Sequence, residues 1–356
     1  MTEIPPVLIL STGRCGSTML TDVLNLHPRI LSVSEFFSAY QLSAFGKRRP
    51  TGDDMWKLYS VQSMRTKLAL RETFHELLYP FGDPEARYTL RTVPPIMAIT
   101  LPNLTDRYEE LYEELEPVVR AQPRQSPADH FRQTFRWLCE RFGRRAWIER
   151  SGGSLLVAPL LLRNFPEARV IHIYRDGRDT SISLSGHPAF RGLLAKARKI
   201  RAWGVDPVKS MPLVQRFNRL GYWMDNFADV FIDNEKLPCD EVTLTDFAAF
   251  WSGLIAIGHR TFGHFPPERL LNVKFEDVQV EPRRELRRII RFISPELDDE
   301  EWLRKAAAIP RPTTRSRFDQ LDEKHQAAVT EACLPGLELL GYPVSLGQDR
   351  MGEDGS

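Results

Sequence analysis

The sequence of 356 residues is 42% hydrophobic, enough to bury a large core. Its 48 basic and 47 acidic residues give a net charge of +1, so no general attraction to nucleic acid or to an anionic membrane is predicted. No stretch approaches the roughly 20 apolar residues of a membrane span, and the chain leads directly into a predicted strand. We therefore expect a cytoplasmic protein with no integral membrane segment and no nucleic acid partner.

Short apolar runs alternate with amphipathic segments along the chain, a pattern typical of a parallel sheet that is covered by helices on both faces. Strands are predicted at 7–10, 30–33, 145–149, 170–174 and 270–274. Helices are predicted at 17–26, 128–142, 154–164, 243–264, 282–292, 299–308 and 321–333. Candidate helix caps include Ser154, Thr243 or Thr245, and Asp298. The fold class is therefore predicted as α/β, with three α/β/α layers in a single domain spanning 1–356.

The first strand leads into a loop with spaced glycines, Ser11-Thr12-Gly13-Arg14-Cys15-Gly16-Ser17-Thr18, at the start of a predicted helix. Unpaired amides and the positive end of the helix dipole favour an anion at such a position, although an ordinary strand-to-helix turn is the alternative. A Walker A loop would carry lysine where Ser17 stands, which weakens a kinase or ATPase interpretation. Cys15 in this loop is either a nucleophile of lowered pKa or, as we favour, a small packing residue.

A second apolar strand, 169–174, leads into Arg175 and the segment that follows it. Ser183 comes eight positions after Arg175, about two turns along the predicted helix, so both side chains are expected to face one ligand. The alternative for Arg175 is a salt bridge with Asp176 or Asp179.

These two segments resemble the two phosphate sites of sulfotransferases that use 3′-phosphoadenosine 5′-phosphosulfate (PAPS), and the fold implied is the P-loop-like sulfotransferase fold. Glu35 lies 21 positions beyond Arg14, as in the tyrosylprotein and related bacterial branches of that family. The resemblance covers about 1–40, 145–185 and 245–342. Further matching segments are His27-Pro28, Ser34-Glu35, 146–151, 164–169, 273–277 with Pro282, and 316–318.

The resemblance implies roles for individual residues. The 5′-phosphosulfate side of PAPS is assigned to Arg14, Cys15, Gly16, Ser17 and Thr18, and the 3′-phosphate to Arg175 and Ser183. Arg315 and Arg317, in a late element that closes over the nucleotide in the family, are further candidates for donor binding.

Catalysis is assigned to Glu35 as the base, with Arg14 and Arg150 stabilising charge on the leaving phosphate. Arg150 stands where many relatives carry lysine, and the proline that follows in them is missing. A guanidinium can stabilise charge there but cannot donate a proton. The alternative for Glu35 is that it caps a helix or pairs with a loop arginine. No metal is predicted, since the four cysteines and the histidines show no ligand spacing.

Two insertions, at about 36–127 and 185–242, are expected to bind the hydroxyl-bearing acceptor, which is a carbohydrate, a lipid or another small molecule. An acidic stretch in the first, 108–116, has apolar residues at helical spacing and predicts a solvated amphipathic helix. The leading hypothesis is a PAPS-dependent sulfotransferase. The alternatives are a P-loop nucleotide or small-molecule kinase and a catalytically inactive nucleotide-binding relative. The sequence does not indicate an oligomeric state.

Overall fold

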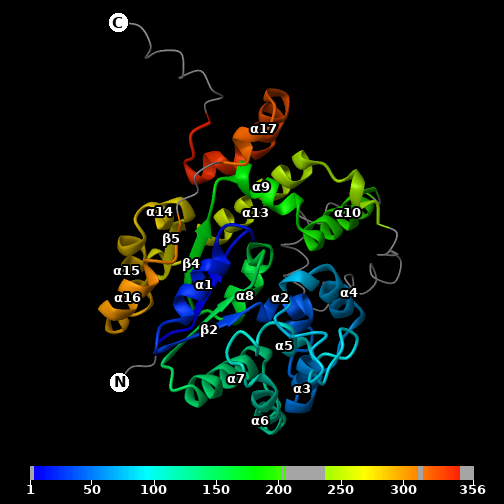
Figure 1. The fold of residues 1–356 in the computed structure, drawn as a ribbon, viewed down its shortest axis with the longest axis vertical. Coiled ribbons are helices and arrows are strands. Elements are labelled where there is room, and N and C mark those ends of the chain that lie inside the picture. The colour runs from blue at the N-terminus through cyan, green and yellow to red at the C-terminus, as the bar shows by residue number, and fades with distance from the viewer. Residues whose placement is uncertain (1–3, 203, 205–236, 312–315, 345–356) are drawn as a thin grey trace, which may run out of the picture.

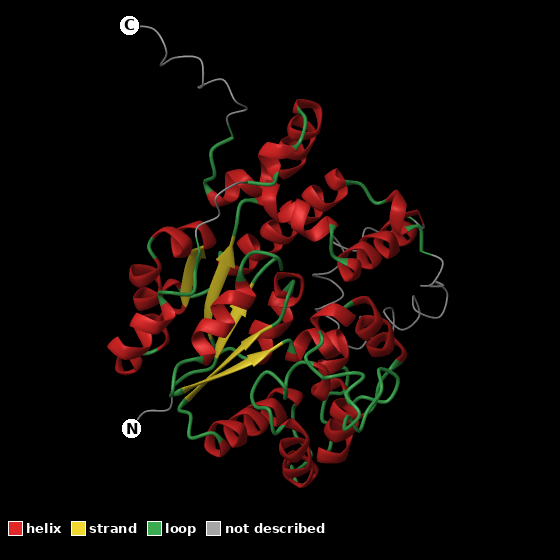
Figure 2. Ribbon diagram, viewed as in Figure 1, coloured by secondary structure: helices red, strands yellow, loops and turns green. Residues whose placement is uncertain are grey.

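Five strands form one parallel sheet in the order β2-β3-β1-β4-β5 (Figure 1, Figure 2). The computed structural model describes residues 4–202, 204, 237–311 and 316–344. The strands are β1 Val7–Leu10, β2 Ile30–Ser34, β3 Ala146–Arg150, β4 Arg169–Tyr174 and β5 Leu270–Lys274. Each lies where the sequence predicted it, with ends that differ by at most one residue.

Helices pack on both faces of this sheet, which confirms the three-layer α/β/α fold class. One face is covered by α1 Ser17–Asn25, α15 Pro282–Ile293 and α16 Glu300–Ala306. The other face carries α7 Pro127–Arg141, α8 Ala158–Asn164 and α13 Leu244–Phe262. The remaining helices are α2 Phe36–Tyr40, α3 Gly52–Ser60, α4 Met64–Glu72, α5 Pro95–Ala98, α6 Tyr108–Arg120, α9 Gly177–Ser185, α10 Pro188–Ala202, α14 Phe275–Val280 and α17 Glu323–Leu340.

The central strand β1 explains why the strands of this sheet are continuous apolar runs in the sequence, without alternating polar residues. Val7 and Ile9 lie in the apolar cluster beneath α1 and α15, whereas Leu8 and Leu10 lie in the cluster on the opposite face. Successive side chains of a strand point to opposite faces, and here both faces are covered. All four residues are consequently fully buried.

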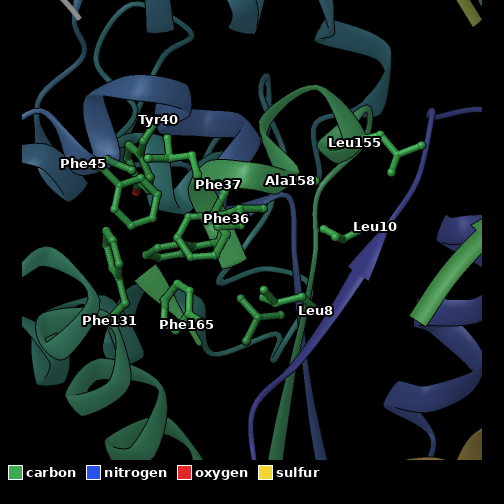
Figure 3. Close-up of a cluster of buried hydrophobic side chains, with 14 of the residues drawn as sticks. Leu8, Leu10, Phe36, Phe37, Tyr40, Phe45, Phe131, Leu155, Ala158 and Phe165 are labelled. Atoms are coloured by element: carbon green, nitrogen blue, oxygen red, sulfur yellow. The ribbon is translucent and has the colours of Figure 1, made fainter. Parts of the chain in front are cut away.

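An aromatic cluster anchors α2 against the sheet at the start of the first predicted insertion (Figure 3). The Phe36 ring lies 4.8 Å from Phe135 and 5.4 Å from Phe131, measured between ring centroids, and both contacts are edge-to-face. Phe37 lies 5.3 Å from Phe131. Such pairs contribute roughly 0.5–1.5 kcal/mol each beyond the area that they bury. The backbone that follows Glu35 is therefore fixed by packing.

Two predicted helix caps are wrong and one is correct. Ser154 does not cap a helix, because its hydroxyl accepts from the Ser11 amide at 3.1 Å. Asp299, rather than Asp298, caps α16 through the Trp302 amide. Thr243 begins α13 with a capping box, as predicted.

The acidic stretch of the first insertion is helical, as predicted. It belongs to α6, whose buried residues Leu111, Leu115 and Val119 follow helical spacing, while its carboxylates face outward. In contrast, α17 extends well beyond the predicted 321–333 and continues through Pro335 to Leu340. Within the described part of the chain, no helix is both long and apolar enough to cross a membrane.

Candidate functional site

The predicted site residues gather at one edge of the sheet, where four neighbouring parallel strands end. The loop 11–16 follows β1, Glu35 follows β2, Arg150 ends β3 and Arg175 follows β4. Because these strands are parallel and adjacent, their carboxyl ends meet at the same edge, which is the usual place for ligands in open α/β sheets.

The loop after β1 turns through left-handed backbone conformations. Gly13, Arg14 and Gly16 have φ values of 79°, 56° and 85°. A Cβ on Gly16 would lie 2.1 Å from the ring of Phe275, so only glycine allows this close approach. Gly16 immediately precedes α1, so the amides of that helix face the loop.

Arg14 connects the two predicted anion-binding segments. Its side chain is 41% exposed, and its Nε donates to the Ser183 hydroxyl at 3.2 Å. Its Nη1 pairs with the Glu76 carboxylate at 3.0 Å, and the same oxygen lies 3.0 Å from His187 Nε2. His187 and then Arg14 hold the pKa of Glu76 below its ordinary value, against the effect of burial. A carboxylate from the first insertion therefore neutralises the arginine expected to bind the donor.

Ser17, Thr18 and Cys15 differ in how much of their side chains is accessible to a ligand. Ser17 is buried and Thr18 is exposed at the start of α1. The Cys15 thiol is fully buried and lies 3.4 Å from the Ile173 carbonyl oxygen. Burial raises its pKa, so the thiol is protonated and the alternative of a nucleophilic cysteine is not supported. Cys15 can contribute to a ligand site only through its backbone.

Arg175 pairs with Asp179 at 3.4 Å, the salt bridge that was the alternative to donor binding. Its guanidinium also lies over the Phe275 ring, 5.6 Å from the centroid. That ring is the one approached by Gly16, so a single aromatic side chain lies against both predicted anion-binding segments. Asp176 pairs with Arg178 instead of Arg175.

The late segment Ser316–Phe318 is tied to α9 through Asp179. One carboxylate oxygen of Asp179 accepts from the Ser316 hydroxyl at 2.9 Å and from the Arg317 and Phe318 amides at 2.9 and 3.2 Å. The Arg317 residue is exposed beside this contact. Arg315 lies outside the described residues.

Glu35 and Arg150 form an ion pair at the ends of β2 and β3. The Glu35 backbone has a φ of 55°, and its amide donates to the Arg150 carbonyl oxygen at 2.7 Å. Its Oε2 accepts from the Gly152 amide at 3.0 Å and from the Ser38 hydroxyl at 2.6 Å. Glu35 therefore does pair with an arginine, as the alternative interpretation held, but the partner is Arg150 at a strand end and not an arginine of a loop.

The Arg150 side chain is only 4% exposed, and its Nε donates to Thr21 Oγ1 of α1 at 3.1 Å. Burial lowers the pKa of Arg150 to about 10, so the guanidinium remains charged at neutral pH. A carboxylate on a strained backbone and a buried cation lie side by side here, with Arg14 close enough to Arg150 to lower its pKa further. Such a pair can accept a proton and stabilise an anion.

Sequence reasoning missed four residues of this region: Glu76, His187, Glu149 and Ser38. Glu76 lies in the first insertion, where no motif marked it, and His187 had been considered only as a metal ligand. No group of three or more metal-ligating side chains occurs within the ranges that the structure describes.

An open groove of about 810 Å³ lies elsewhere, along α15. It is lined mainly by arginines, but each of them pairs with a carboxylate, and none of the predicted site residues lines the groove. We do not assign the site to it. The pairs are Arg283–Glu300, Arg284–Glu285, Arg287–Glu300, Arg288–Glu285 and Arg291–Asp298.

Comparison with known protein families gives two matches. The model described as "Sulfotransferase family" matches residues 5–209, more than half of the chain, and the model described as "Sulfotransferase domain" matches residues 156–317. No curated protein matches the sequence.

Among solved structures, the sulfotransferase domain from the curacin biosynthetic pathway is 14% identical, with 97% of this chain and 100% of that chain covered and a TM-score of 0.49. The sulfotransferase domain of the Synechococcus PCC 7002 olefin synthase is 17% identical, with 96% and 97% covered and a TM-score of 0.45. Sulfotransferase STF9 from Mycobacterium avium is 16% identical, with 96% and 78% covered and a TM-score of 0.44.

Proposed function

This chain belongs to the sulfotransferase family, and from that premise we propose that it transfers a sulfuryl group from PAPS to a hydroxyl of an acceptor. The observation that carries the proposal is the 3.2 Å contact between Arg14 and Ser183. One residue belongs to the loop expected at the 5′-phosphosulfate and the other to the helix expected at the 3′-phosphate. Their contact supports a single ligand that spans both segments.

The donor supplies an activated sulfuryl group on a phosphate leaving group. Arg14, the hydroxyls of Ser17 and Thr18 and the backbone of Cys15 and Gly16 are proposed to hold the 5′ end. Arg175 and Ser183 are proposed to hold the 3′-phosphate, and Arg317 and Arg315 are weaker candidates for contacts with the nucleotide.

Glu35 is proposed to take the proton of the acceptor hydroxyl as the new oxygen–sulfur bond forms. The bond between sulfur and the bridging phosphate oxygen breaks in the same step, and the charge that develops on that oxygen is stabilised by Arg14 and Arg150. The Glu35 carboxylate accepts hydrogen bonds from the Gly152 amide and the Ser38 hydroxyl, and it pairs with Arg150. Arg150 lies between α1 and Glu35 and can pair with either the carboxylate or the leaving group.

We propose one domain with two insertions that build the acceptor site. The direct contact of Glu76 with Arg14 supports this for the first insertion, because it brings that segment to the predicted donor site. The tyrosylprotein-like branch, a cytoplasmic location and the class of acceptor stay predictions.

Donor binding is tested with adenosine 3′,5′-bisphosphate (PAP), the product of the donor. PAP is expected to raise the melting temperature, whereas ATP with Mg²⁺ is not. Arg175→Ala should weaken PAP binding far more than binding of adenosine 5′-monophosphate, which lacks the 3′-phosphate. Arg141→Ala, which removes an exposed arginine paired with Glu114, serves as the charge control. Equal losses for both nucleotides would count against the assignment of Arg175, and stabilisation by ATP alone would favour the kinase alternative.

Turnover is tested with radiolabelled PAPS and an extract of the source cell, followed by mass spectrometry for a sulfate addition and by measurement of PAP release. Glu35→Gln should abolish turnover and keep PAP binding. Unchanged turnover would remove Glu35 from the mechanism. PAP binding without any sulfate transfer by the unaltered protein would favour the inactive relative.

A further inference from the structure

A second carboxylate, Glu149, lies immediately before Arg150 on the opposite face of β3. It is fully buried, and burial raises its pKa to about 7. Its Oε1 accepts from the Ser151 hydroxyl at 2.6 Å and from the Phe37 amide at 3.2 Å. Its Oε2 has no hydrogen-bond partner among the described residues. A carboxylate in this place is costly compared with an apolar side chain, so its contacts deserve a functional explanation.

These contacts lead directly to Glu35. The Ser151 hydroxyl accepts from the Ser38 amide at 2.9 Å, and the Ser38 hydroxyl donates to Glu35 Oε2 at 2.6 Å. Glu149 therefore holds the first turn of α2 both directly, through Phe37, and indirectly, through Ser151. That turn directly follows Glu35, whose backbone is left-handed.

We propose that Glu149 is a positioning residue, which uses Ser151 and the first turn of α2 to hold Glu35 in its left-handed conformation beside Arg150. This inference rests on the proposed function, because it assumes that Glu35 is the base. A residue with φ near 55° is retained only where surrounding contacts fix it. Here three backbone amides provide those contacts. The Glu35 amide donates to the Arg150 carbonyl oxygen. The Phe37 and Ser38 amides donate to the side chains of Glu149 and Ser151.

Two substitutions separate the acceptor role of Glu149 from its charge. Glu149→Leu removes the acceptor for Phe37 and Ser151, and a shift of Glu35 by about 1 Å is expected to lower kcat roughly 100-fold. The KM for PAPS and the Kd for PAP should change less than about twofold, because the donor-binding residues are untouched. Glu149→Gln keeps an acceptor oxygen in the place of Oε1, which accepts both hydrogen bonds. Its NH₂ group takes the place of Oε2, which accepts none from the described residues, so this variant should retain most of the wild-type kcat.

Glu285→Leu is the matched control for loss of a buried carboxylate. Glu285 is 3% exposed and pairs with Arg284 and Arg288 on α15, neither of which is a proposed site residue. This substitution should lower stability without changing kcat, measured as PAP release from PAPS with the cell extract as acceptor source.

A double-mutant cycle decides whether Glu149 acts through Glu35. Glu149→Leu should cause little further loss of kcat in the Glu35→Asp background, because the shortened side chain keeps a carboxylate base but has already left the position that Glu149 is proposed to hold. An equal fold-loss in both backgrounds, or a wild-type kcat for Glu149→Leu alone, would overturn the inference.

The milder substitution Ser151→Ala keeps the test decisive if Glu149→Leu does not fold. It should lower kcat about tenfold with PAP affinity retained, and an unchanged kcat would overturn the inference. Failure of the proposed function has a different signature: Glu35→Gln would then retain turnover, or the unaltered protein would release no PAP, whatever the substitution at Glu149 does.

Discussion

Replacement of Gly16 by alanine should destabilise the protein and weaken donor binding together. A non-glycine residue in the left-handed region costs about 1–2 kcal/mol. The new Cβ would also lie 2.1 Å from two carbons of the Phe275 ring, and displacement of a packed ring costs a further 1–3 kcal/mol or so. The expected loss is about 2–5 kcal/mol, which lowers the melting temperature of a chain of this length by about 3–7 °C. Because the same ring lies under Arg175, its displacement should raise the Kd for PAP.

The matched control is Gly143→Ala. Gly143 has a φ of 62°, but no atom lies within 4 Å of the Cβ that alanine would add. This substitution should cost only the backbone strain, about 1–2 kcal/mol, and leave the Kd for PAP unchanged. Both proteins are compared by thermal unfolding and by calorimetric titration with PAP. Equal losses of stability in the two variants would refute the reasoning that close approach to Phe275 makes Gly16 necessary.

Two further predictions concern charge. Glu76→Gln should strengthen PAP binding up to about fivefold, because Arg14 loses a competing carboxylate in an exposed pair; an unchanged Kd in titration would contradict this. His172 is buried with its pKa lowered to about 4, so the unfolded state, with a pKa near 6.5, gains the proton first as the pH falls. Folding should therefore lose about 3 kcal/mol between pH 6.5 and 4 through this residue. His172→Gln should reduce that loss in urea unfolding at pH 7 and 4.5, and equal pH dependence would argue against it.

The strands, and the site residues that directly follow them, could be predicted from sequence for one physical reason. A strand buried on both faces must be apolar throughout, so 7–10 and 170–174 are conspicuous, and the residues directly after such strands lie at the carboxyl edge of the sheet. Arg14, Arg175 and Glu35 follow from that rule together with the family resemblance.

Contacts across long separations could not be predicted in the same way. Glu76 meets Arg14 only because the first insertion folds back over the loop, and its sequence surroundings carry no signature of an anion site. Glu149 occupies a strand position where a side chain facing the core is normally apolar, so its hydrogen bonds to α2 are apparent only from the folded backbone. The predicted cap of α16, Asp298, is one residue from the observed cap, Asp299, because either of two consecutive aspartates suits a helix start.

The strand order also has a consequence for biosynthesis. β1 pairs only with β3 and β4, so Val7 has no neighbour in the sheet until Ile148 or Arg169 is available. At about 5–20 residues per second, a ribosome needs about 7–30 s to cover that interval. During this time the most apolar strand of the nascent chain is unpaired, which makes it a natural target for chaperones and for aggregation.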